Sequence, residues 1–146
     1  MKLQIRNRFE KVLGGASIRH DEKTSYGEEI VGLLNTVWPR LREKNVVQNG
    51  INVVVYDPDG TVFAGVEMSE PDARGCGLKS KTVKLGRYGY VKHVCPYNQL
   101  HETCVRMTEE LSRMGHRPIQ PIVEIYGHWT DDESQLVTEI LHSISE

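Results

Sequence analysis

The sequence predicts an α+β fold in which one unit, ordered strand, helix, strand, strand, occurs twice. The observations behind this prediction are two segments with apolar residues at helical spacing, a β-hairpin signal in the first half, and an apolar strand at residues 122–126 after the second helix. Two such halves meet about a pseudo-twofold axis, and a groove forms where they meet. We therefore expect a single domain over residues 1–146, with repeat units at about 8–70 and 81–146.

The strands of the first half are expected at residues 11–20, 51–56 and 61–66. We interpret Gly14 and Gly15, which interrupt the apolar residues of the first strand, as a β-bulge. The other two strands form a hairpin, because Pro presets φ early in the turn and Gly accepts a positive φ at its end; the turn is Asp57-Pro58-Asp59-Gly60. A long loop is expected to follow, at residues 69–80, which are rich in Gly, Pro and charge.

An amphipathic helix is expected between the first two strands. Ser25 and Glu28 have the spacing of a capping box, and the apolar residues beyond them recur at helical intervals: Ile30, Leu33, Leu34, Val37, Trp38 and Leu41. Pro39 lies inside this pattern, where it removes a hydrogen bond and clashes with the carbonyl four residues earlier. We expect the helix to kink or restart near Trp38.

The second half is expected to begin with a strand at residues 82–94. The run Pro96-Tyr97-Asn98 opens a second helix, which Gly115 ends and whose apolar residues are Leu100, Cys104, Met107, Leu111 and Met114. The strand at residues 122–126 follows. In the last segment, residues 136–144, the spacing of the apolar residues fits a helix better than a strand.

Composition and charge exclude several classes of function. The apolar fraction of 38%, the charged fraction of 26% and the net charge of −2 are those of a soluble globular protein and give no electrostatic reason to expect nucleic acid as a partner. The N-terminal residues lack the apolar core of a secretory signal, and no run approaches the roughly 18 apolar residues of a membrane span. We therefore expect a cytoplasmic protein with no direct nucleic-acid or membrane partner.

The cysteines Cys76, Cys95 and Cys104 form an odd set without a CxxC pair, which is typical of thiols in a reducing compartment. We interpret them as packing residues. The alternative is a zinc site that combines Cys95 and Cys104 with His93 and His101, but paired ligands at regular spacing are missing. No metal and no cofactor are expected.

Glu124 is the most informative candidate for a functional residue. It places a carboxylate inside the apolar run 122–126, and no Lys or Arg lies within three residues on either side. Moving an ionised carboxylate out of water costs several kcal/mol unless a cation or hydrogen-bond donors meet it. Three explanations stay open: the side chain faces water, it bonds to a neighbouring Tyr hydroxyl, or a ligand supplies the missing cation.

Two parts of the second half resemble a known family. Residues 90–98, which contain His93, Pro96 and Tyr97, and the strand with Glu124 and Tyr126 resemble the GyrI-like domain, also called the AraC-type effector-binding domain. In the first half, Trp38 in the helix and the sequence Phe-Ala-Gly-Val-Glu at 63–67 are similar to that family's motifs. The resemblance extends from about Arg8 to Ile144, and Cys95 departs from it because the family usually has Gly before Pro.

The resemblance implies two βαββ units that form an antiparallel sheet with two helices against it and a pocket between the halves. It also implies that residues 136–144 form a strand, and we follow it against the periodicity. In that family a Glu in the pocket contacts flat, lipophilic cations among aromatic rings. The matching residue is Glu124, with Tyr126 on the same face of the strand.

A carboxylate among aromatic rings binds organic cations, because each ring adds roughly 0.5–2 kcal/mol of cation–π attraction. The candidate ligand-binding residues are Glu124, Tyr126, Trp38, Tyr56, Phe63, Tyr88, Tyr90 and Trp129. Trp38 fits the helical core equally well, and Trp129 is a candidate lid because it lies in a loop beside the strand of Glu124. We interpret Glu67 as solvated, with a second pocket carboxylate as the alternative.

Two classes of function follow. The first is a binding protein for cationic, amphipathic or aromatic molecules that acts by sequestration or sensing. Many members of the family are fused to a DNA-binding helix-turn-helix; we expect none here, so the protein acts alone, as a homodimer or with a separate regulatory partner. The alternative is a hydrolase, since some GyrI-like proteins open strained cyclopropane-containing compounds; Glu124 then positions water and Tyr126 donates a proton. We favour binding.

Overall fold

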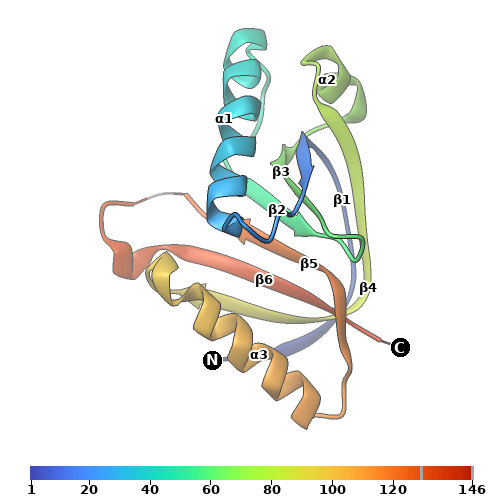
Figure 1. Ribbon diagram of the computed structural model, residues 1–146, viewed down its shortest axis with the longest axis vertical. Coiled ribbons are helices and arrows are strands. Elements are labelled where there is room, and N and C mark those ends of the chain that lie inside the picture. Colours follow the sequence, from blue (N-terminus) through green and yellow to red (C-terminus); the bar gives the residue numbers. More distant parts are fainter. Residues whose placement is uncertain (129, 146) are drawn as a thin grey trace.

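The strands pair antiparallel and close into a barrel in the computed structural model, which describes residues 1–128 and 130–145. They are β1 (Gln4–Arg19), β2 (Asn52–Tyr56), β3 (Thr61–Glu67), β4 (Lys79–Val94), β5 (Pro118–Tyr126) and β6 (Val137–Ile144). The order around the barrel is β1, β3, β2, β5, β6, β4 (Figure 1). The predicted antiparallel pairing is confirmed, and the sheet closes on itself because the long strands β1 and β4 pair with each other and each with a further strand.

Within the described residues, three α-helices accompany the barrel: α1 (Tyr26–Lys44), α2 (Glu70–Gly75) and α3 (Leu100–Arg113). The helices α1 and α3 were both expected. The order β1, α1, β2, β3 is followed by β4, α3, β5, β6, with α2 between the two sets. The order strand, helix, strand, strand therefore occurs in both halves, whereas a pseudo-twofold relation between them stays a prediction.

The helix α2 replaces half of the loop expected at residues 69–80. Ser69 caps it, since its hydroxyl oxygen accepts a hydrogen bond from the backbone N–H of Asp72 at 3.2 Å. Pro71 lies in the first turn of the helix, where a missing N–H is harmless. The prediction of a loop was wrong here because a capping residue and an N-terminal Pro stabilise a short helix.

The cap of α1 was predicted correctly, whereas the restart near Trp38, one of the two outcomes predicted from Pro39, does not occur. The hydroxyl oxygen of Ser25 accepts from the backbone N–H of Glu28 at 3.1 Å. The helix continues through Pro39 to Lys44. Pro39 has no N–H to donate to the carbonyl of Asn35. Both residues are exposed, so water can supply the missing hydrogen-bond donor.

The turns follow the sequence signals. Gly60, with a φ of 88°, closes the β2–β3 turn by donating its N–H to the Asp57 carbonyl at 3.1 Å. Gly115, with a φ of 86°, ends α3, and the N–H of His116 reaches back to the Leu111 carbonyl at 2.9 Å. Together with the bond from the Gly115 N–H to the Ser112 carbonyl at 3.0 Å, this bond forms the Schellman arrangement that glycine permits after a helix.

Gly14 and Gly15 do not form a bulge, because the β1–β3 register runs without a shift from Leu13 to Arg19. Instead, they permit the backbones of β1 and β3 to approach each other closely. A Cβ on Gly15 would lie 2.2 Å from the Ala64 carbonyl oxygen, and one on Gly65 would lie 2.1 Å from the Gly14 carbonyl oxygen. The glycines allow the paired backbones of β1 and β3 to approach to a distance that no side chain tolerates.

The last segment is a strand, as the resemblance implies and against its apolar spacing. It pairs with both β4 and β5, so both of its edges are hydrogen-bonded. Ile140 packs in a cluster with residues of α3, whereas its neighbour Leu141 packs in the cluster that fills the barrel. A strand buried on both faces gives a nearly continuous apolar run, which is why its spacing resembled that of a helix.

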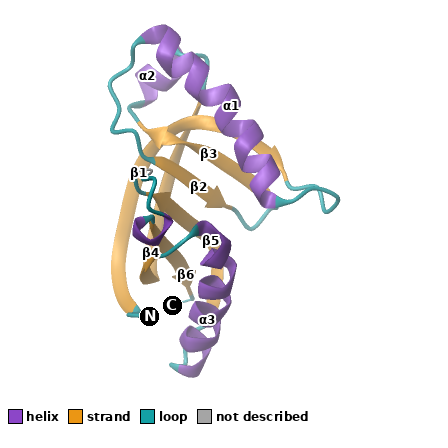
Figure 2. Cartoon of the chain, turned by 90° about the vertical axis from the view of Figure 1, so that its left-hand side faces the viewer, coloured by secondary structure: helices purple, strands orange, loops and turns teal. Residues whose placement is uncertain are grey.

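The alternation along β5 places Glu124 outside the barrel. Val123 belongs to the interior cluster, whereas Ile122 packs with α3 and Tyr126 with the cluster under α1. Glu124 shares the face of Ile122 and Tyr126. Figures 1 and 2 both show α1 and α3 at opposite ends of this outer face, with β2 and β5 between them.

None of the helices in the described ranges combines the length and apolarity that a membrane crossing needs.

Candidate ligand-binding groove

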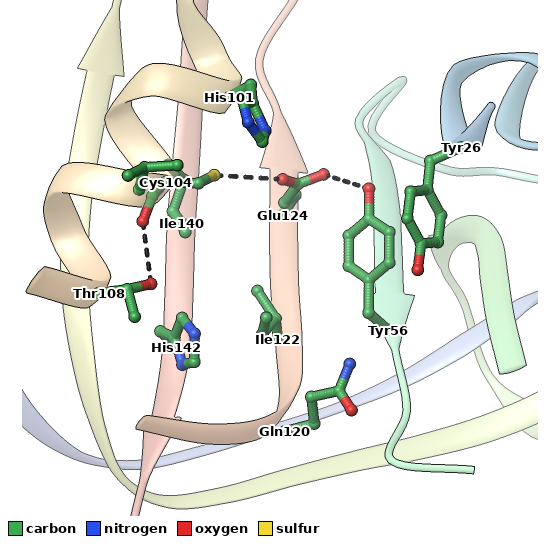
Figure 3. A pocket seen from close by; sticks show the side chains of 11 residues that line it. Tyr26, Tyr56, His101, Cys104, Thr108, Gln120, Ile122, Glu124, Ile140 and His142 are labelled. Atoms are coloured by element: carbon green, nitrogen blue, oxygen red, sulfur yellow. Dashed lines mark hydrogen bonds between the residues drawn. The ribbon is translucent and has the colours of Figure 1, made fainter. Parts of the chain in front are cut away.

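A pocket of about 290 Å³ lies on the outer face of the barrel, between the first residue of α1 and one side of α3 (Figure 3). The helix α3 forms one wall with His101, Cys104, Val105 and Thr108. The floor comes from β5 and β6 with Gln120, Ile122, Glu124, Ile140 and His142, and the opposite wall consists of Tyr26 and Tyr56. The pocket thus combines tyrosine rings, apolar side chains and several polar side chains with one carboxylate at its floor.

Glu124 is buried, with 5% of its surface exposed. Its Oε1 accepts hydrogen bonds from the hydroxyls of Tyr56 at 2.8 Å and Tyr126 at 2.7 Å, and the Cys104 thiol faces Oε2 at 3.9 Å. Within residues 1–128 and 130–145, no nitrogen of a Lys, Arg or His side chain lies within 4.0 Å of this carboxylate. Neutral donors therefore meet the charge, and among the described residues no cationic side chain is in contact with it.

The groups around Glu124 stay protonated at neutral pH. Burial, and then the negative charge of Glu124, raise the pKa values of the Tyr56 and Tyr126 hydroxyls far above their usual range. The same causes raise the pKa of the Cys104 thiol to about 12. Cys104 is therefore no thiolate nucleophile, and both hydroxyls remain donors to Glu124.

Of the predicted rings, Tyr56 and Tyr126 are brought to Glu124, whereas Phe63, Tyr88 and Tyr90 lie inside the barrel. Tyr88 and Tyr90 share one face of their strand, and that face points inward. The sequence could not reveal this because both faces of β4 carry apolar residues. These rings belong to the barrel core and do not line the groove.

Two of the predicted rings that do not line the groove have partners of their own. The hydroxyl of Tyr90 donates to Glu139 at 2.5 Å, and the guanidinium carbon of Arg6 lies 3.6 Å from the centroid of its ring. Trp38 packs against the cluster that joins α1 to α2, and its Nε1 donates to Asn52 Oδ1 at 2.9 Å. The predicted lid residue Trp129 lies outside the described residues.

The wall from α3 was not predicted. His101, Cys104, Val105 and Thr108 are spaced i, i+3, i+4 and i+7, so they lie on one face of the helix. This spacing was visible in the sequence, but only Cys104 was counted as apolar. Tyr26, directly after the Ser25 cap, gave no signal that it would line a groove.

Three further candidates are placed by local contacts. His93 holds the turn before α3: its Nε2 donates to the Pro96 carbonyl at 3.3 Å, and its Nδ1 lies 2.9 Å from the Thr103 hydroxyl. Tyr97 packs edge-on against Tyr126, with ring centroids 5.6 Å apart. Glu67 pairs with Lys11 at 3.3 Å and is 47% exposed, so it is a solvated residue and not a second pocket carboxylate.

Nowhere in the part of the chain that the structure covers do three or more His, Cys, Asp or Glu side chains gather as a metal site would need.

Thr138 gives a prediction on stability beside the groove. It pairs with Tyr126 across β5 and β6, and its buried hydroxyl has no hydrogen-bond partner among the described residues. Because an unsatisfied buried polar group costs about 1–3 kcal/mol, Thr138→Val is expected to raise the free energy of unfolding by about 1 kcal/mol in urea denaturation. The matched change Thr103→Val, which removes the bond to His93, is expected to lower it. A loss of stability in Thr138→Val would show that its hydroxyl is satisfied.

Comparison with known proteins identifies the fold alone. No family model matches the sequence, and no curated protein matches it. Among solved structures, the chain is similar to the EcmrR C-terminal domain, with a TM-score of 0.70 and 13% identity over 99% of this chain and 98% of that one. It is also similar to SAV2435 bound to tetraphenylphosphonium, with a TM-score of 0.67 and 12% identity over 99% of this chain and 94% of that one. A third similar structure is a hydrolase from Listeria innocua, with a TM-score of 0.63 and 13% identity over 99% and 92% of the two chains.

Proposed function

We propose that this protein binds cationic, aromatic or amphipathic small molecules in the groove at Glu124. The observation that carries the proposal is a buried carboxylate that no cation of the described chain balances. Two tyrosine hydroxyls compensate part of the cost of its burial, and a ligand cation would compensate the rest. A GyrI-like effector-binding domain with pseudo-twofold symmetry is the family assignment that we propose with it.

The groove suits such a ligand in shape and in chemistry. Its volume of about 290 Å³ and its apolar lining, which includes Ile122, Val105 and Ile140, fit an aromatic body. The rings of Tyr26 and Tyr56 offer faces and edges beside the charge. Removing water from this site strengthens the attraction between the ligand cation and the carboxylate, because the effective dielectric constant falls.

We propose sequestration or sensing of such cations in the cytoplasm, alone, as a homodimer or with a separate regulatory partner. The named ligand of SAV2435, tetraphenylphosphonium, is an aromatic cation of the proposed class. We do not propose an enzyme, because at 13% identity the likeness to the Listeria innocua hydrolase carries no activity. The hydroxyl of Tyr126, the proton donor in the hydrolase alternative, already bonds to Oε1 of Glu124.

Titration of the native protein with two ions of the same shape and opposite charge tests the proposal. Tetraphenylphosphonium is expected to bind with one-to-one stoichiometry in calorimetry. Tetraphenylborate, which would meet the Glu124 carboxylate as a like charge, is expected to bind at least about tenfold more weakly. Equal affinity for both ions would show that the groove recognises only apolar surface.

A further inference from the structure

Tyr26 is the outer aromatic wall of the groove. It is the first residue of α1, lines the pocket and is 46% exposed. Its ring packs edge-on against Tyr56, with centroids 5.3 Å apart and an interplanar angle of 85°. Because Tyr56 donates to Glu124, Tyr26 is one ring removed from the carboxylate (Figure 3). An exposed side chain at a helix start is free to rotate unless another group fixes it.

His20 is that group. Its ring stacks on Tyr26 with centroids 3.8 Å apart and an angle of 11°. Its backbone N–H donates to the Gly60 carbonyl at 2.9 Å, which ties this residue to the β2–β3 turn. His20 itself does not line the pocket, so any effect that it has on a ligand in the groove must pass through Tyr26.

Glu29 fixes His20 in turn. Its buried carboxylate accepts from His20 Nδ1 at 2.5 Å and from the backbone N–H of Asp21 at 3.0 Å. The hydrogen bond from His20, and then that from Asp21, lower the pKa of Glu29, so the side chain is ionised at neutral pH and acts only as an acceptor. The imidazole therefore has one orientation, with Nδ1 as the donor.

We propose that His20 and Glu29 are positioning residues that hold Tyr26 as a fixed wall of the Glu124 groove and thereby favour ligands with an aromatic ring beside their positive charge. The proposal rests on the proposed function. A wall that is fixed before binding raises affinity, because no side-chain entropy is then lost when the ligand stacks on it.

The competing explanation is that these contacts only stabilise the start of α1, and a double-mutant cycle separates the two. Tyr26→Leu is expected to weaken tetraphenylphosphonium binding about threefold to tenfold, as for the loss of one cation–π contact. His20→Ala is expected to weaken it in the native background and to have no effect in the Tyr26→Leu background. An equal effect of His20→Ala in both backgrounds would overturn the proposal.

Glu29 and its neighbour Glu28 provide a matched pair of variants. Both lie in the first turn of α1, so each Glu→Gln change removes the same favourable interaction with the helix N-terminus. Only Glu29 bonds to His20, whereas Glu28 is exposed. Glu29→Gln is therefore expected to weaken binding, and Glu28→Gln to leave it unchanged. Equal losses in the two variants would indicate a helix effect and refute the positioning role.

A ligand-free measurement keeps the inference separate from the proposed function. Proton NMR of the native protein is expected to show contacts between the Tyr26 ring and the rings of His20 and Tyr56. In His20→Ala the contact between Tyr26 and Tyr56 is expected to weaken strongly; if it persists unchanged, His20 does not hold Tyr26. Failure of native protein to bind tetraphenylphosphonium would refute the proposed function, and the NMR result would still decide the positioning role.

Discussion

Glu124→Gln is expected to weaken tetraphenylphosphonium binding by about 30-fold or more, which corresponds to about 2 kcal/mol. The change removes the negative charge and keeps the size of the side chain. The Gln carbonyl oxygen can still accept from Tyr56 and Tyr126, which both bond to one oxygen, Oε1, in the native protein. The shape of the groove is thereby conserved, and calorimetric titration of the two proteins measures the contribution of the charge.

The same substitution is expected to leave the free energy of unfolding unchanged or to raise it. An ionised carboxylate with 5% exposure has a desolvation cost that a neutral amide of the same size largely avoids. Denaturation in urea without ligand measures this. A variant that loses affinity while it keeps or gains stability identifies Glu124 as a residue retained for binding and not for folding.

Glu67→Gln is the matched control for this prediction. Glu67 carries the same charge on a neighbouring part of the barrel, but it is solvated and paired with Lys11. Its replacement is expected to change affinity less than about twofold, because exposed charges are screened by solvent. Equal affinity of Glu124→Gln and native protein would refute the proposed function.

The centre of the groove was predictable from the sequence, and its surroundings were not. Glu124 stands out because a carboxylate interrupts an apolar strand, and Tyr126 follows from the two-residue period of that strand. Tyr56 joins them through the β2–β5 pairing, which places it opposite Ile122. Sequence spacing does not reveal such a pairing, so Tyr56 could be proposed only as one ring among several.

The fold, like the groove, was predictable from the sequence only where the signals are local. Local signals such as the Ser25 cap, the Gly60 turn and Gly115 after α3 were read correctly, because each acts within a few residues. Closure of the barrel depends on the long-range β1–β4 pairing, which no local pattern encodes. The strand β6 was misjudged by periodicity for a related reason: its burial on both faces comes from elements far away in the chain.

Gly65→Ala is expected to destabilise the protein by about 3 kcal/mol or more, the upper range for overpacking. A Cβ at this position would lie 2.1 Å from the carbonyl oxygen of Gly14 and 2.8 Å from the Cα of Gly15. These are backbone atoms, which cannot turn aside as the end of a flexible side chain can. The paired strands β1 and β3 must then separate at this position, and the loss of stability is measured as a lower midpoint of urea denaturation.

Gly32→Ala provides the contrast, since the same atom is added at a glycine of α1 that has nothing within 4 Å of the new Cβ. Alanine is preferred over glycine in a helix by about 1 kcal/mol, so this variant is expected to be more stable than the native protein. If Gly65→Ala lowers the free energy of unfolding and Gly32→Ala raises it, then the close approach of the paired strands β1 and β3, and not conformational freedom, requires glycine at position 65. A loss below about 1 kcal/mol in Gly65→Ala would mean that the two strands can separate there at little cost, and that closure of the barrel does not depend on this contact.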